Sequence, residues 1–281
     1  MANSADLAAQ LAAPARAPGA SRIFAVANQK GGVGKTTTAI NLGTALASVG
    51  RRVLVIDLDP QGNASTGLGI DRHNRRESTY NLLRGEVTID SAAVTSREVP
   101  GLSVVPSTTE LSGADVELMG ESDGRQRLKS ALRNAAGAGP DQYDYVLIDC
   151  PPSLNILTVN ALTAADSVIV PLQTEFFALE GLSQLVRTIQ RIRKNLNPEL
   201  GIQGVILTMF DKRHRSCEEV ASEAREFLGD LVYRTIVPRN VTIAEAPSHG
   251  QPVLMYDPKS PGSQAYIALV NEVLEREEEP V

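Results

Sequence analysis

The segment Lys30–Thr37, with the sequence Lys-Gly-Gly-Val-Gly-Lys-Thr-Thr, constrains the fold of this chain more than any other. An apolar run at residues 23–27 precedes it, and residues 36–49 follow it with the apolar spacing of a helix. A strand, a glycine-rich turn and a helix in this order form the context of a phosphate-binding loop. Backbone N–H groups of such a loop and of the helix N-terminus surround an anion, and glycines let the backbone approach it. The segment therefore predicts a nucleoside triphosphate site, and the full spacing disfavours an ordinary glycine turn.

The loop carries two lysines, which are expected to have different roles. Lys35 stands where it reaches the β- and γ-phosphates, and the Thr36 hydroxyl is placed to bind Mg²⁺. The usual pattern has its first glycine five residues before Gly34, where this chain has Gln29, and Lys30 comes next. One lysine suffices to hold a phosphate within one subunit, so Lys30 indicates a further use. We expect ATP to contact Lys30, Gly31, Gly32, Val33, Gly34, Lys35, Thr36 and Thr37.

Carboxylates follow two other apolar runs at the point where each predicted strand ends. Residues 53–56 lead into Asp57 and Asp59, and residues 145–148 lead into Asp149. In open α/β sheets, ligands bind at the carboxyl ends of the strands. We expect Asp149 to hold Mg²⁺ through water opposite Thr36, Asp57 to lie near the metal, and Asp59 to orient the attacking water. The alternatives are that Asp149 caps the next turn and that Asp59-Pro60 starts one.

The alternation of apolar runs and helical segments predicts an α/β fold, with a doubly wound, mostly parallel sheet and helices on both faces. Residues 22–281 are expected to form one domain, and residues 1–21, rich in Ala, Pro and Ser, a disordered tail. Residues 71–100 resemble a surface helix with connectors, with Arg72, Arg75 and Arg76 exposed. The predicted strands are residues 23–28, 53–57, 102–106, 145–149, 167–171, 202–208 and 233–237, and the main helices are 36–49, 111–119, 124–136, 179–196 and 263–276.

Composition limits the classes of function. A formal net charge of −6 argues against a generally basic DNA-coating protein, although a local basic patch remains compatible with it. The absence of Trp and an aromatic content of 4% disfavour base stacking as the main mode of binding. Cys150 and Cys217 fit no metal-ligand spacing, and no apolar run is long enough to span a membrane. We expect a cytoplasmic protein.

Several motifs of the chain resemble those of the ParA/MinD group of ATPases, whose phosphate-binding loop opens with a second lysine. The match is to the chromosomal ParA (Soj) partition ATPases in particular, and it runs in order from residue 23 to about residue 266. The matching segments are Ala27–Thr38, Ile56–Asn63, Leu147–Ser153, Glu175–Leu182, Pro238–Asn240 and Glu245–Ser248.

The resemblance implies an ATP-driven switch. In this family ATP joins two subunits face to face, so Lys30 would cross to the partner's phosphates, and Gly31 would lie where a larger side chain blocks the approach. The homodimer binds double-stranded DNA without sequence preference, which implies association with the nucleoid. Hydrolysis would use Asp59 together with Lys30 and Lys35, and a ParB-type partner at centromere-like sites stimulates it. The resemblance also places Pro238, Arg239 and Asn240 beside the adenine.

DNA contact is expected to involve basic residues after the strand 202–208 or on the helix 179–196. Arg213 matches a family position that contacts DNA, so we rank it first. Relatives often have arginine where this chain has Thr242, and the missing cation would weaken DNA binding or move it to neighbouring basic residues. The other candidates are Lys212, Arg215, Arg191 and Lys194.

Four other functions use related sequences. A MinD-like membrane switch requires a basic amphipathic C-terminal helix, whereas this chain ends in the acidic segment Glu275–Val281. A reductase-type electron carrier requires paired interface cysteines to hold a cluster. An amidotransferase or synthetase, which would phosphorylate a small carboxylate or amine, is disfavoured by the segment Glu175–Leu182. A DNA-binding regulator of replication initiation stays open as an additional role.

Overall fold

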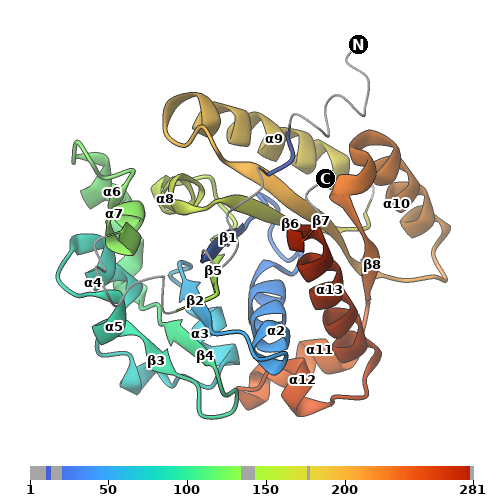
Figure 1. The fold of residues 1–281 in the computed structure, drawn as a ribbon, viewed down its shortest axis with the longest axis horizontal. Coiled ribbons are helices and arrows are strands. Elements are labelled where there is room, and N and C mark those ends of the chain that lie inside the picture. Colours follow the sequence, from blue (N-terminus) through green and yellow to red (C-terminus); the bar gives the residue numbers. More distant parts are fainter. Residues whose placement is uncertain (1–10, 14–20, 134–142, 176–177, 279–281) are drawn as a thin grey trace.

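The computed structural model describes residues 11–13, 21–133, 143–175 and 178–278. Its centre is an eight-stranded sheet with the order β3-β4-β2-β5-β1-β6-β7-β8, in which only the β3–β4 pair is antiparallel. Helices cover both faces of this sheet (Figure 1). The predicted α/β fold with a mostly parallel sheet is therefore confirmed. The strands are β1 (Arg22–Val26), β2 (Val53–Asp57), β3 (Val94–Thr95), β4 (Leu102–Val105), β5 (Tyr145–Asp149), β6 (Ser167–Gln173), β7 (Gly201–Phe210) and β8 (Val232–Pro238).

Two apolar cores lie on opposite faces of the sheet, because alternate residues of each strand point in opposite directions. In β2, Leu54 and Ile56 belong to one core and Val53 and Val55 to the other. The first core is covered by α4 (Thr79–Arg84), α5 (Ile89–Ala92), α6 (Ala114–Met119), α7 (Arg127–Arg133), α8 (Ile156–Ala164), α9 (Ala178–Asn195) and α10 (Arg215–Leu228). The second is covered by α2 (Lys35–Ser48), α3 (Asn63–Gly67), α12 (Val253–Tyr256) and α13 (Pro261–Glu278).

Two helices of the first face are absent from the helices predicted above. All residues of α8 except Val159 are buried, so the segment has no polar stripe that would give it helical periodicity. Helix α10 begins only five residues after the end of β7, and the sequence predicts basic residues for this segment without a helix. Among the described residues, no helix is long and apolar enough to cross a membrane.

Part of the predicted disordered tail is ordered. Ala12 forms a parallel bridge with Ile202 at the start of β7, and Leu11 is buried in the first core. A Cβ atom at Gly201 would lie 2.3 Å from the Cα atom of Ala13. Only glycine therefore lets these two segments of the chain approach this closely. For residues 11–13 the prediction is therefore wrong, since a sheet contact and a buried leucine fix them. Residues 1–10 and 14–20 lie outside the described part of the chain.

Candidate functional site

The loop between β1 and α2 has the backbone that its glycines predict. Gly32 and Gly34 have φ values of 74° and 91°, in the left-handed region that glycine adopts without steric cost. Gly34 is also the N-cap of α2 and offers no side-chain cap, so the first N–H groups of the helix are available for an anion. The Thr208 hydroxyl of β7 donates to the carbonyl of Val33 at 2.9 Å, and the amide of Asn28, just after β1, donates to the carbonyl of Pro171 in β6 at 2.7 Å.

The two lysines of the loop make different contacts within the protein. Lys35 is buried, and its Nζ donates to the carbonyl of Lys30 at 3.0 Å. Burial lowers the pKa of Lys35, while the charge of Asp149 acts in the opposite direction. Lys30 is partly exposed and forms an ion pair with Glu175 at 2.5 Å. Lys35 therefore lies inside the site, and Lys30 is held at its rim by a carboxylate from the β6–α9 connection.

Asp57 and Asp149 lie side by side, because β2 and β5 are parallel neighbours in which these two residues are paired in register. Both are fully buried. The backbone N–H and the hydroxyl of Ser65 donate to Asp57 Oδ2 at 2.7 and 2.6 Å, so the start of α3 holds this carboxylate. Neither oxygen of Asp149 accepts a hydrogen bond of ordinary geometry from the described residues, although the Thr36 hydroxyl lies near enough to act on this carboxylate.

Burial and mutual repulsion control the ionisation of this pair. Burial raises the pKa of Asp57 to about 6, against the hydrogen bonds from Ser65, which act to lower it. Burial, and next the charge of Asp57, raise the pKa of Asp149 well above its usual value. The two carboxylates therefore compete for ionisation until a cation neutralises them.

The donor set fits Mg²⁺. A fully buried carboxylate is costly unless a cation or several donors pair with it, and neither oxygen of Asp149 has a hydrogen bond of ordinary geometry. No cluster of three or more acidic, histidine or cysteine side chains forms a metal cage in the described part of the chain. Mg²⁺ usually needs only one or two carboxylates, and phosphate and water oxygens complete its shell. Asp149 and Thr36 would hold it, with Asp57 behind them.

Asp59 begins a tight turn after β2. Its Oδ1 accepts from the N–H of Gln61 at 2.9 Å, and its carbonyl accepts from the N–H of Gly62 at the same distance. The side chain is buried, and the N–H of Asp59 is 3.3 Å from Asp57 Oδ1. The structure thus brings Asp57, Asp59 and Asp149 to one edge of the sheet. The alternative that Asp59-Pro60 starts a turn is correct, and it is compatible with the predicted role of Asp59 in the site.

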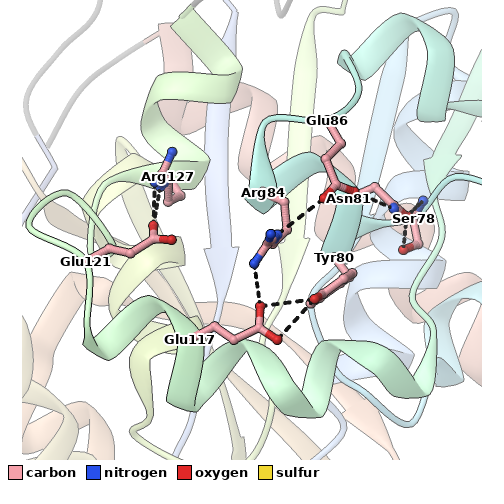
Figure 2. Close-up of polar contacts among 8 residues, drawn as sticks. All are labelled: Ser78, Tyr80, Asn81, Arg84, Glu86, Glu117, Glu121 and Arg127. Atoms are coloured by element: carbon pink, nitrogen blue, oxygen red, sulfur yellow. Dashed lines mark hydrogen bonds and ion pairs between the residues drawn. The ribbon is translucent and has the colours of Figure 1, made fainter.

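Helix α6 braces the loops of this edge. Figure 2 shows Glu117 of α6 accepting from Tyr80 and Arg84 of α4, the latter at 2.9 Å. The neighbouring Asp115 accepts from Asn155, the N-cap of α8, at 2.8 Å. Helix α4 is itself tied to β2, since the Thr79 hydroxyl donates to the carbonyl of Asp57 at 2.8 Å. Helix α6 therefore connects the segment after Asp57 with the segment after Asp149.

The predicted adenine-side residues lie at the end of β8, at the same edge as the phosphate-binding loop. Pro238 is paired with Phe210 of β7, and the N–H of Arg239 donates to the Phe210 carbonyl at 2.9 Å. The Asn240 side chain accepts from the N–H of Ile243 and so caps α11 (Val241–Glu245). This short segment is therefore fixed by backbone contacts, while the Arg239 side chain is exposed.

The structure separates the DNA-binding candidates into two groups. Helix α9 connects the parallel strands β6 and β7, so it runs back across the sheet and carries Arg191 and Lys194 away from the carboxyl edge. Lys212, Arg213 and Arg215 follow β7 at that edge. Arg213 is 83% exposed and pairs with Asp211 at 2.6 Å, whereas Arg215 pairs with Glu219 at 3.0 Å. Lys212 is exposed.

Sequence reasoning missed several residues that hold the site. Ser65 and Thr79 support Asp57, Thr208 supports the phosphate-binding loop, and Glu175 contacts Lys30. Three of them are buried hydroxyl residues, Ser65 within α3, Thr79 at the start of α4 and Thr208 within β7, and no local sequence pattern singles them out. Glu175 belongs to a matching segment, of which residues 176 and 177 lie outside the described part of the chain.

Comparisons with known proteins agree with this geometry. A family model described as an AAA domain matches residues 21–202. Chromosome partitioning protein ParA of Caulobacter vibrioides is 60% identical over 256 residues, or 91% of this chain and 95% of that protein. Sporulation initiation inhibitor protein Soj of Bacillus subtilis is 49% identical over 253 residues, or 90% and 98%. The structure of cobyrinic acid a,c-diamide synthase from Mycobacterium smegmatis with bound ADP and magnesium gives a TM-score of 0.79 at 36% identity, covering 93% of this chain and 97% of that one.

Proposed function

Because the chain belongs to the ParA/Soj family of chromosome-partitioning ATPases, we propose that it is an ATP-dependent dimerisation switch in the segregation of a chromosome or plasmid. ATP and Mg²⁺ are its cofactors. In this proposal the ATP-bound homodimer binds double-stranded DNA without sequence preference, and a ParB-type partner stimulates hydrolysis and so releases the subunits. The protein would then be cytoplasmic and associated with the nucleoid.

The observation that carries the proposal is the pair of lysines in one loop. Lys35 is buried against its own loop, as a lysine serving phosphates in the same subunit should be. Lys30 is partly exposed at the rim, where only Glu175 holds its ammonium among the described residues. An exposed ion pair of this kind contributes at most about 1 kcal/mol, so the phosphates of a second subunit could readily replace Glu175 as the partner of Lys30.

Gly31 offers a sharp test of the face-to-face dimer. A Cβ atom there would meet nothing within 4 Å, and the backbone is not in the left-handed region, so the monomer has room for a side chain. We expect Gly31→Val to keep ATP binding and the melting temperature of the monomer while losing ATP-dependent dimerisation. Sedimentation velocity with a slowly hydrolysed ATP analogue would measure this, with Lys30→Ala as a second variant.

If Gly31→Val dimerises at the same protein concentrations as the wild type, the face-to-face arrangement is contradicted. A matched control is Gly31→Ala, which adds one methyl group to the same open space and should weaken dimerisation less than valine does. Retained ATP binding, measured by titration calorimetry, separates a blocked dimer interface from a damaged nucleotide site.

A synthetase is the competing enzyme class, because the similar structure from Mycobacterium smegmatis is named a diamide synthase. Its identity to this chain is 36%, against 60% and 49% for the two partition and sporulation relatives. The partition function is therefore favoured. ATP turnover that needs a small carboxylic acid and ammonia or glutamine, and is indifferent to DNA, would support the synthetase instead.

A further inference from the structure

Arg75 is a buried cation that the proposed mechanism does not use. It follows the short 3₁₀ helix η1 (Arg72–Asn74), and the sequence predicts that it is exposed with its neighbours. That prediction is wrong for Arg75, which is 8% exposed, whereas Arg72 and Arg76 do face solvent. No carboxylate lies within ion-pair distance of this guanidinium in the described ranges, and burial lowers the pKa of Arg75 while the charge of Asp57 acts in the opposite direction. Burying a charged group without an ion-pair partner is costly unless its N–H groups donate hydrogen bonds to other acceptors.

The guanidinium joins separate backbone segments around α3. Its Nε and Nη2 donate to the carbonyl of Ile70 at 3.2 and 2.9 Å, and Nη2 also donates to the Thr66 hydroxyl at 2.8 Å. Its Nη1 donates to the carbonyl of Ser107, just beyond β4, at 2.9 Å. Four of the five N–H groups therefore have acceptors. One rigid, planar group thus fixes both the end of α3 and the neighbouring strand end.

The same group lies against the turn that carries Asp59. A Cβ atom at Gly62 would lie 2.2 Å from Arg75 Nη1, so the guanidinium lies directly beside the Gly62 backbone. Gly62 closes the turn by donating its N–H to the Asp59 carbonyl, and its φ of 65° requires glycine. Ser107, held by Arg75, in turn donates its N–H to Ser65 Oγ at 3.0 Å, and Ser65 holds Asp57.

We propose that Arg75 is a positioning residue for ATP hydrolysis, which fixes the turn bearing Asp59 against α3 and the end of β4. Arg75 does not contact the nucleotide in this account, and it acts through Gly62, Thr66 and Ser107. Lysine cannot replace it, because an ammonium has no planar fork with which to reach the three acceptors on these two segments together. The proposal rests on the proposed role of Asp59 in hydrolysis.

Steady-state ATP hydrolysis by Arg75→Lys, Arg75→Gly and Asp59→Ala tests the proposal, with the exposed Arg76→Lys and Arg76→Gly as matched controls. We expect both Arg75 variants to lose about tenfold or more in kcat with KM for ATP changed less than about threefold, since misplacing a catalytic group mainly affects turnover. The space left in Arg75→Gly should accept free guanidinium, so millimolar guanidinium chloride should restore part of kcat, whereas sodium chloride at equal ionic strength should not.

A wild-type kcat in Arg75→Lys would overturn the proposal. So would a loss in Arg75→Gly that guanidinium does not restore and that follows a fall in melting temperature and nucleotide affinity, because this pattern describes a merely structural residue. Asp59→Ala separates the proposed role of Arg75 in positioning from the proposed role of Asp59 in hydrolysis. If it hydrolyses ATP as the wild type does, the proposed role of Asp59 fails, whatever the Arg75 variants do.

Discussion

At the scale of single residues, ionisation of the buried Asp57 lowers the stability of the nucleotide-free protein. It is fully buried beside Asp149, and burial raises its pKa to about 6. An aspartate in an unfolded chain has a pKa of about 3.9, so the native state binds this proton more tightly. Stability from this source is therefore fully present below about pH 4 and is lost as the pH rises through about 6. A metal-nucleotide complex would offset the loss by pairing with the ionised carboxylates.

Asp57→Asn should remove this pH dependence in the nucleotide-free protein. A shift of about two pKa units corresponds to about 3 kcal/mol, which is an upper value for a buried, interacting pair. Between pH 4 and pH 7.5, the wild type should lose up to this much unfolding free energy relative to Asp57→Asn, as measured by urea denaturation. The exposed Asp230→Asn serves as the control and should follow the wild type. Parallel pH profiles for wild type and Asp57→Asn would refute the expectation.

The main residues of the site could be predicted from the sequence because they follow strands with strong apolar runs. Lys35, Asp57 and Asp149 stand directly at the ends of such runs or in the glycine-rich loop, and strand pairing brings them together. The supporting residues could not be predicted in this way. Whether Arg75 is buried depends on where the β4 end lies, and this is a contact between segments 32 residues apart.

At the scale of elements, the basic residues that follow β7 and those of α9 are expected to contribute differently to DNA binding. The β7–α10 connection carries Lys212 and Arg213, and α10 begins with Arg215, all at the same edge as the nucleotide loops, whereas α9 carries Arg191 and Lys194 toward the other edge. DNA binding that depends on ATP should use the group nearer to the nucleotide. The sequence alone could not choose between them, because it shows where the cations stand along the chain without giving the direction in which each helix runs.

Arg213→Glu should therefore abolish ATP-dependent DNA binding while ATP binding survives. The exposed Arg225→Glu makes the same charge change near the other end of α10 and is the matched control. Fluorescence anisotropy with random-sequence duplex DNA should give an unchanged affinity for Arg225→Glu. For the milder Arg213→Gln, the slope of log affinity against log salt should fall by about one, as expected when one phosphate contact is removed. An unchanged affinity in Arg213→Glu would remove Arg213 from the DNA surface.

At the scale of the whole molecule, the fold gathers every proposed nucleotide contact at the carboxyl edge of one sheet. The phosphate-binding loop follows β1, the aspartates follow β2 and β5, and Pro238–Asn240 follow β8. This edge was predictable, because parallel α/β sheets place their ligands there. The net charge of −6 predicts that any DNA binding depends on a local basic patch, since the chain as a whole repels DNA.

The most direct test of the switch is binding to random-sequence duplex DNA with ATP, with ADP and without nucleotide. Wild type and Asp59→Ala would be compared across a salt series. We predict binding only with ATP, retained by Asp59→Ala and falling steeply with salt, because the dimer and not hydrolysis creates the DNA surface. Equal binding in all three nucleotide states, or no binding in any of them, would contradict the account.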